Sequence, residues 1–237
     1  MSLSLYKSHQ RGRAEHGWLH ARFSFSFSGY YDSTRMNFGV LRVLNNDIIE
    51  PASGFGMHPH DNMEIITYII EGSLEHHDSE GNHGVIQAGE VQYMSAGAGV
   101  QHSERNPSLT HKTELFQIWI YPNERGGTPL YAQKDCNAIN MNGTWKLLVS
   151  SDGSDDSIKI RQNASMYMTK LKAGESVSID SVENTHGRFL MLVSGAGNVE
   201  NFEMQERDEL QINDTNSYIF EATQDTHLML FEVPMQK

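Results

Sequence analysis

Hydrophobic and polar residues alternate with a period of two along much of the chain. The residues from Phe23 to Ser28 read FSFSFS, so a strand there would place three phenylalanines on one face and three serines on the other. Other short runs are rich in the β-branched and aromatic residues that pleated strands favour. We expect strands in these further runs: residues 38–43, 65–70, 114–121 and 228–233.

Turn-forming residues separate these runs at short intervals. Glycine, asparagine and aspartate favour turns because they tolerate left-handed backbone angles or bond to their own backbone. The segments that we interpret as turns are Asn45-Asn46-Asp47, Glu71-Gly72-Ser73, Glu80-Gly81-Asn82, Ala88-Gly89-Glu90 and Gly126-Gly127. Short strands with frequent turns predict an all-β barrel or sandwich. A helical stretch is expected only near residues 132–138.

The same order of features occurs twice in the sequence. Each copy has an apolar strand, a glycine turn, an acidic turn before a short strand, and a closing apolar strand that ends in proline. The copies run from Ile65 to Pro122 and from Arg188 to Pro234. Two β-units in tandem explain this repetition. We therefore predict an N-terminal domain at residues 1–134 and a C-terminal domain at residues 135–237.

The composition limits the function more than the fold. The chain has 237 residues, twelve histidines, one cysteine and a formal charge of −12. A single cysteine cannot form an intramolecular disulfide or a cysteine-rich metal site. The acidic charge argues against nucleic-acid binding, because phosphates need clustered lysine and arginine. No apolar stretch approaches the ~20 residues of a membrane span and no secretory leader is visible, so we expect a cytoplasmic protein without membrane contact.

Two short motifs place candidate metal ligands on strand faces. His58 and His60 are two residues apart beside a glycine turn, and His102 and Glu104 have the same spacing. Residues i and i+2 of a strand point to one side, so each pair can present two donor atoms to one ion. Three imidazoles and one carboxylate suit one divalent transition metal ion with an open position. This donor set leaves Fe, Cu, Ni, Mn, Co and Zn as alternatives.

Only the first of the repeated units carries these motifs. In the second unit, residues 207–210 (RDEL) take the place of the turn at Gly89, and no H-x-H or H-x-E follows them. We therefore predict one barrel that binds metal and one degenerate barrel without metal ligands.

The histidine motifs lie in longer segments that resemble a known family. The segment from Gly54 to Gly72 has the pattern G-x3-H-x-H-x3-E-x7-G and resembles the first motif of the cupin superfamily, while the segment from Gly89 to Asn106 resembles the second. More narrowly, the chain resembles the pirin family, in particular the bacterial pirin-like proteins of the YhhW type. The supporting segments are residues 16–19 (HGWL), 25–27 (FSF), 30–32 (YYD), 54–72 and 94–107.

This resemblance implies a bicupin fold, with two antiparallel β-barrels and one metal in the N-terminal barrel. It implies that His58, His60, His102 and Glu104 bind the metal, and that Glu64, a ligand in many other cupins, lies in the second layer or in the pocket. Bacterial proteins of this type are described as quercetinases, which open the ring of a flavonol such as quercetin with O2 and release carbon monoxide. Glu104 would then be the catalytic base that takes the proton of the flavonol 3-hydroxyl.

Two other classes of function are open alternatives. Eukaryotic pirins are similar and act as metal-dependent partners of transcription regulators, so the chain is alternatively a non-catalytic regulatory protein. Cupins also include isomerases of sugars or small acids. We favour a monomeric dioxygenase that acts on a small planar aromatic substrate and O2.

The remaining polar residues have ordinary structural interpretations. His76 and His77 lie in a polar hairpin segment and are expected to be solvated, as are the acidic residues 200–209 and the polar loop at 150–156. The histidines outside the two motifs are expected to have no metal role. Cys136 is expected to be unreactive. The phenylalanines of the FSFSFS run are expected in the core, with a pocket position for one of them as the alternative.

Overall fold

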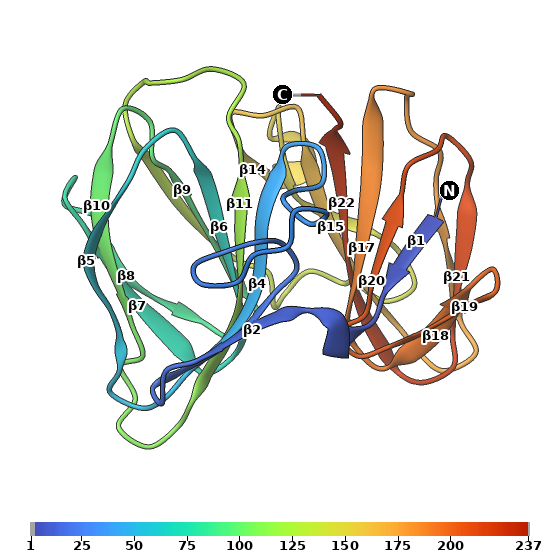
Figure 1. The fold of residues 1–237 in the computed structure, drawn as a ribbon, viewed down its shortest axis with the longest axis horizontal. Coiled ribbons are helices and arrows are strands. Elements are labelled where there is room, and N and C mark those ends of the chain that lie inside the picture. Colours follow the sequence, from blue (N-terminus) through green and yellow to red (C-terminus); the bar gives the residue numbers. More distant parts are fainter. Residues whose placement is uncertain (1–2, 237) are drawn as a thin grey trace.

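The computed structural model describes residues 3–236, which form two β-barrels side by side (Figure 1). The first barrel contains both histidine motifs, and the second is built mainly from the C-terminal half of the chain (Figure 1). Each barrel has one seven-stranded and one four-stranded sheet. This arrangement confirms the predicted all-β bicupin. The outer limits of the predicted domains, residues 1 and 237, lie outside the described residues.

The large sheet of the first barrel has the strand order β12-β9-β6-β11-β4-β3-β2, and its small sheet has the order β5-β10-β7-β8. The bounds of these strands are β2 Gly12–Glu15, β3 Leu19–Phe23, β4 Leu41–Ile49, β5 Gly54–His60, β6 Glu64–Glu71, β7 Ser73–Asp78, β8 His83–Gln87, β9 Glu90–Ser95, β10 Val100–Arg105, β11 Thr113–Ile120 and β12 Leu130–Asp135. The turn between β6 and β7 needs glycine, because Gly72 has a φ of 77° and a β-carbon there would lie 2.6 Å from the carbonyl oxygen of Lys112.

The second barrel repeats this plan. Its large sheet has the order β1-β20-β17-β22-β15-β13-β14, and its small sheet has the order β16-β21-β18-β19. The bounds are β1 Leu3–Tyr6, β13 Lys146–Ser150, β14 Ile158–Lys159, β15 Ser165–Leu171, β16 Ser176–Ile179, β17 His186–Ser194, β18 Ala196–Val199, β19 Phe202–Gln205, β20 Glu209–Ile212, β21 Tyr218–Ala222 and β22 Thr226–Pro234. The internal repeat inferred from the sequence therefore corresponds to two units with matching strand orders.

The large sheets of the two barrels pack against each other. Their central strands have two buried faces, and this explains continuous apolar runs such as Ile65 to Ile70 in β6. The buried cluster between the sheets includes Phe25 and Phe116 from the first barrel and Phe189 and Phe231 from the second. The two barrels are thus held together by an extensive apolar core.

Strand β1 lies in the second barrel although it precedes the first barrel along the chain. It pairs with β20, and the chain then crosses to β2 in the first barrel (Figure 1). Later in the chain, β12 pairs with β9 of the first barrel and β13 pairs with β15 of the second. The domain limits 1–134 and 135–237 stay a prediction, and they would assign β1 to the barrel opposite to the one it joins.

Two expectations for local structure are wrong. Residues 132–138, expected to be helical, begin inside β12, where pairing with β9 favours an extended backbone. Residues 3–236 contain two short 3-10 helices, η1 (Ser8–Gln10) and η2 (Ser154–Asp156), and no α-helix. The segment Asn45-Asn46-Asp47, expected to be a turn, lies in the middle of β4, where all three side chains are buried.

The phenylalanines of the FSFSFS run do not share one face. Strand β3 ends at Phe23, and beyond it both Ser24 and Ser26 are as buried as Phe25. The Phe25 ring packs 5.7 Å from that of Phe189 in the second barrel, whereas Phe27 packs against Trp119 in the first. The segment leaves the sheet and passes between the barrels, so both kinds of side chain find buried partners.

The acidic segment 200–209 is not solvated throughout. Glu209 is fully buried and forms ion pairs with Arg35 and with Arg11, whose Nε lies 2.8 Å from its carboxylate. Asp208 is also buried and accepts hydrogen bonds from the N-terminal segment that links the barrels. The expectation of a solvated face is therefore wrong at these two positions, because distant arginine and lysine residues compensate their charge.

Among the described residues, none of the helical segments has the length and apolar character that a membrane crossing requires.

Candidate metal centre

The two histidine motifs lie on neighbouring strands of the small sheet in the first barrel. Strand β5 carries His58 and His60, β10 carries His102, and the register places His102 directly opposite His58. One face of this sheet meets solvent, so the residues alternate between outside and inside: Met57 is 56% exposed, whereas His102 is buried. The alternation turns all three imidazoles into the barrel.

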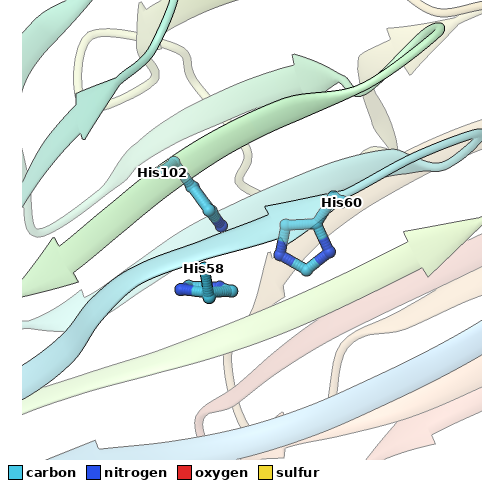
Figure 2. A group of neighbouring side chains, drawn as sticks. All are labelled: His58, His60 and His102. Carbon is cyan, nitrogen blue, oxygen red and sulfur yellow. The ribbon is translucent and has the colours of Figure 1, made fainter.

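The three histidines form one compact group (Figure 2). Each offers a ring nitrogen, and these atoms all lie within 4.8 Å of one another. The ring centroids are 4.5 Å apart for His58 and His102, and 4.8 Å apart for each of the other two pairs. Three imidazole nitrogens at this separation can meet at a single ion bound at the usual distance of about 2 Å.

The protonation state of the group suits metal binding. Burial, together with the neighbouring histidines, lowers the pKa of His60 to about 4 and the pKa of His102 to about 3. Both side chains are therefore neutral near pH 7, and a neutral imidazole is the form that donates a lone pair to a metal.

Hydrogen bonds fix which nitrogen faces the shared centre. Nδ1 of His58 lies 2.8 Å from the carbonyl oxygen of Gly56 and donates its proton to it, which leaves Nε2 as the lone-pair donor. Nε2 of His102 is buried and has no hydrogen-bond partner in the part of the chain that the structure describes. A buried nitrogen without a partner is costly unless a ligand or a metal satisfies it. The donor set present in the chain thus fits a divalent metal.

Glu104 lies beside the three histidines. Its carboxylate is 4.0 Å from Nε2 of His102 and accepts hydrogen bonds of 3.1 and 3.3 Å from the amide of Gln117. The side chain is only 4% exposed. Gln117, on β11, had no role in the sequence interpretation, although a lone polar residue inside the apolar run LFQIWI was a signal that could have revealed it.

These groups line a cavity of about 170 Å³ with aromatic walls. The lining residues are Phe27, Asn45, Asp47, Phe55, His58, His60, His102, Glu104, Gln117 and Trp119. Four buried polar atoms of this lining have no hydrogen-bond partner within residues 3–236: Nε2 of His102, Nε1 of Trp119, and Oδ1 of both Asn45 and Asp47. Such a concentration of unpaired polar atoms in one cavity is typical of a ligand site.

His76 lies directly behind His102, and the expectation that it is solvated is wrong. It is fully buried, and its Nδ1 is 3.4 Å from Nδ1 of His102. Nδ1 also accepts a hydrogen bond from Gln92, and Nε2 donates to Asp78. These contacts orient the His102 ring from behind. The alternation of β7 around the buried Leu74 was the signal for an inward His76, while His77 is exposed as expected.

Glu64 lies outside this cavity, so the expectation of a pocket position or of a place behind the ligands is wrong. The side chain is fully buried on the opposite face of the large sheet, where it accepts hydrogen bonds from Tyr93, Ser95 and the backbone N–H of Arg161. Arg161 lies between β14 and β15, which are strands of the second barrel. Glu64 therefore joins the two barrels and contributes nothing to the lining of the metal centre.

The environment of the single cysteine makes its thiol unreactive. Cys136 is buried, and burial raises the pKa of its thiol to about 11. The thiol therefore stays protonated near pH 7, in the form that is a poor nucleophile.

Comparison with known proteins identifies the family. The family model described as Pirin matches residues 6–120, and the model described as Quercetinase C-terminal cupin domain matches residues 147–233. The chain is 41% identical to a quercetin 2,3-dioxygenase of Escherichia coli over 97% of this chain and 98% of that protein. It is 40% identical to a pirin-like protein of Caulobacter vibrioides over 93% and 95% of the two chains.

A solved structure agrees with the fold and contains a bound metal. The crystal structure of the bacterial pirin YhhW from Escherichia coli in complex with nickel(II) superposes with a TM-score of 0.93 at 40% identity, and the match covers 98% of this chain and 99% of that one. Fold, sequence and the histidine group of the first barrel point to one conclusion: the chain belongs to the pirin family of bicupins.

Proposed function

We propose that this protein is a metal-dependent dioxygenase that cleaves flavonols of the quercetin type. One flavonol and one O2 would give one carbon monoxide and the ring-opened ester, which accounts for all atoms. The observation that carries the proposal is the three-histidine group in an aromatic-walled cavity with unpaired buried polar atoms. The relatives named quercetin 2,3-dioxygenase support the same reaction class.

In this proposal His58, His60, His102 and Glu104 bind one divalent transition metal ion. The chemistry of the donors admits Fe, Cu, Ni, Mn, Co and Zn. When bound, such an ion supplies a Lewis acid that lowers the pKa of a coordinated hydroxyl. The hydrogen bond from His58 to Gly56 and the contact of His102 with His76 hold two of the rings in the orientation that this role needs.

Glu104 is the catalytic base of the proposed reaction. Its carboxylate is an acceptor inside the cavity, next to the histidine group, and can take the proton of the flavonol 3-hydroxyl. The amide of Gln117 donates to both carboxylate oxygens and so holds the base in place. The aromatic rings of Phe27, Phe55 and Trp119 form walls that suit a planar substrate and exclude water from the site.

The test follows flavonol absorbance and headspace carbon monoxide after metal-loaded protein is mixed with quercetin in air. We expect stoichiometric carbon monoxide from the wild-type protein. His102→Ala should lose both bound metal and turnover, while His111→Ala, an exposed histidine outside the cavity, should keep both. Loss of absorbance without carbon monoxide would mean autoxidation. Metal and flavonol binding without any turnover would instead favour the regulatory alternative.

A further inference from the structure

Asn45 and Asp47 are polar residues inside a β-strand, at positions where the fold itself does not require polar side chains. They lie in the middle of β4, where Asn45 is 2% exposed and Asp47 is 5% exposed. Both point into the first barrel and line the metal cavity. Asn46, between them, points the other way and bonds to Arg207 and Glu114. The structure thus explains the polarity of Asn46 and leaves that of its two neighbours unexplained.

The two inward side chains have unused hydrogen-bonding capacity. Oδ1 of Asn45 and Oδ1 of Asp47 are buried and have no partner among the described residues. An unpaired buried polar atom destabilises the folded protein. Two such atoms on one strand, two residues apart and on one face, therefore indicate a binding partner that approaches from the cavity.

A second cavity adjoins the metal cavity at these residues. It measures about 460 Å³ and shares Phe27, Asn45, Asp47 and Phe55 with the lining of the metal cavity. Its remaining walls include Trp18, whose ring meets that of Phe55 edge-on at 5.0 Å. Aromatic walls on both sides suit a flat ring, so the two cavities together offer space for a substrate longer than the metal cavity alone can hold.

The charges around the two oxygens select neutral hydroxyl groups as the partner. Asp47 and Glu104 line the same cavity, and two carboxyl groups disfavour an anionic ligand. Burial, then the charge of Glu104, raises the pKa of Asp47 to about 7, against the opposing effect of Arg11. A phenolic hydroxyl can both donate and accept, so it pairs with this carboxyl group in either protonation state and with the amide of Asn45.

We propose that Asn45 and Asp47 bind the hydroxyl groups of the substrate's outer aromatic ring, the phenyl ring next to the flavonol 3-hydroxyl. The two residues thereby select substrates whose outer ring is hydroxylated. This inference rests on the proposed function, because it assumes that the 3-hydroxyl of the flavonol meets the histidine group.

The experiment compares quercetin, which has two adjacent hydroxyls on that ring, with galangin, the same flavonol without them. The metal-loaded wild-type protein should prefer quercetin in kcat/KM and in the dissociation constant measured anaerobically by calorimetry. In Asn45→Leu and in Asp47→Leu this preference should shrink by about 10-fold or more, because a hydrogen bond to a hydroxyl of the outer ring is lost. The values of kcat/KM and of the dissociation constant for galangin should change little. Asn46→Leu is the matched control, because it removes an equally buried amide that faces away from the cavity.

The ratio of kcat/KM for the two flavonols separates an effect on substrate recognition from a general effect on folding. Asn46→Leu should lower kcat/KM for both substrates by the same factor. The ratio of kcat/KM for quercetin to that for galangin should then stay at its wild-type value. A wild-type protein that does not distinguish the two flavonols overturns the inference even if no variant folds, and so does an unchanged ratio in both cavity variants. If neither flavonol is turned over, the proposed function fails, and the anaerobic dissociation constants alone decide the role of Asn45 and Asp47.

Discussion

The two barrels share one strand order but differ in what fills them. A contact that occurs in both barrels allows equivalent positions to be aligned. In each barrel, a threonine at the start of the closing strand donates its hydroxyl to the carbonyl of the first residue of a small-sheet strand. Thr113 donates to the carbonyl of Ser73 at 2.6 Å, and Thr226 donates to the carbonyl of Ala196 at 3.0 Å. Positions in the first barrel can therefore be matched with positions in the second.

The closing strands differ at the inward position four residues after this threonine. In β11 that residue is Gln117, whose amide holds Glu104. In β22 it is Leu230, which packs in the apolar cluster inside the second barrel. The backbone plan is the same, and the side chain alone decides whether the position serves a polar site or a core.

The small sheets show the same contrast. His76 lies three residues after Ser73, and β10 places Glu104 opposite it. Val199 lies three residues after Ala196, and β21 places Phe220 opposite it. Where the first barrel has a carboxylate and an imidazole, the second has two buried apolar side chains.

The difference between the two interiors shows how one unit of a tandem repeat can contribute stability while the other contains a polar site. A polar interior with unpaired atoms costs stability, whereas the apolar filling of the second barrel contributes it. The apolar core between the large sheets and the buried carboxylate of Glu209 connect the two barrels. The second barrel can therefore stabilise the first through this interface.

The largest effect should come from Glu104→Gln, which keeps the shape of the side chain but removes the base. We expect turnover of quercetin to fall by about 100-fold or more, the usual contribution of a general base, while the three histidines retain part of the metal. Steady-state kinetics and elemental analysis check the two expectations. Glu221→Gln changes an exposed carboxylate on the matching strand β21 and should leave both unchanged. Wild-type turnover in Glu104→Gln would remove Glu104 from the chemistry.

The matched substitution in the second barrel should act on stability alone. Phe220→Ala removes a fully buried ring from the apolar cluster and should lower the free energy of unfolding by about 3–5 kcal/mol. Urea unfolding measures this loss. Activity per bound metal, measured where the variant is folded, should stay at the wild-type value. A change in metal content or in kcat would show that the second barrel shapes the site directly.

Asp47→Asn should change how the stability of the protein depends on pH, because the interior of the first barrel destabilises the charged form of Asp47. Burial and the charge of Glu104 raise the pKa of Asp47 to about 7 in the folded protein, above the value near 4 of an unfolded chain. The folded state therefore binds more protons between these values, and this group's contribution to stability is lost as pH rises through 7. Relative to wild type, the variant should gain about 2–3 kcal/mol of stability between pH 5 and pH 8.

Urea unfolding of the metal-free proteins at the two pH values tests this expectation. Titrating groups that do not interact with Asp47 cancel in the difference between variant and wild type, since both proteins contain them. A difference that stays constant between pH 5 and pH 8 would mean that Asp47 titrates near its usual pKa.

The sequence predicted those features that depend on local pattern. Alternation and turn residues indicate the strands, and the i, i+2 spacing of His58 and His60 indicates two imidazoles on one face, which the structure shows. His76 was missed because its polar neighbours suggested solvent, although the strand period points it inward. The burial of Glu209 depends on Arg11 and Arg35, which lie far away in sequence. Such long-range pairing leaves no mark in the local pattern.

Gln117→Leu should give the smallest effect, because it changes a residue that acts only through Glu104. The substitution gives β11 the residue that β22 has at the matching position, and it removes the donor that bonds to both oxygens of Glu104. We expect kcat to fall by about 10-fold, the lower end of what loss of an outer hydrogen bond costs at a metal site, with little change in KM. Leu230→Gln, the reverse exchange, should instead lower stability with no change in kcat, because it buries an unpaired amide in the second barrel. Equal kinetic effects of both substitutions would mean that the two interiors are coupled, and the division of roles between the barrels would fail.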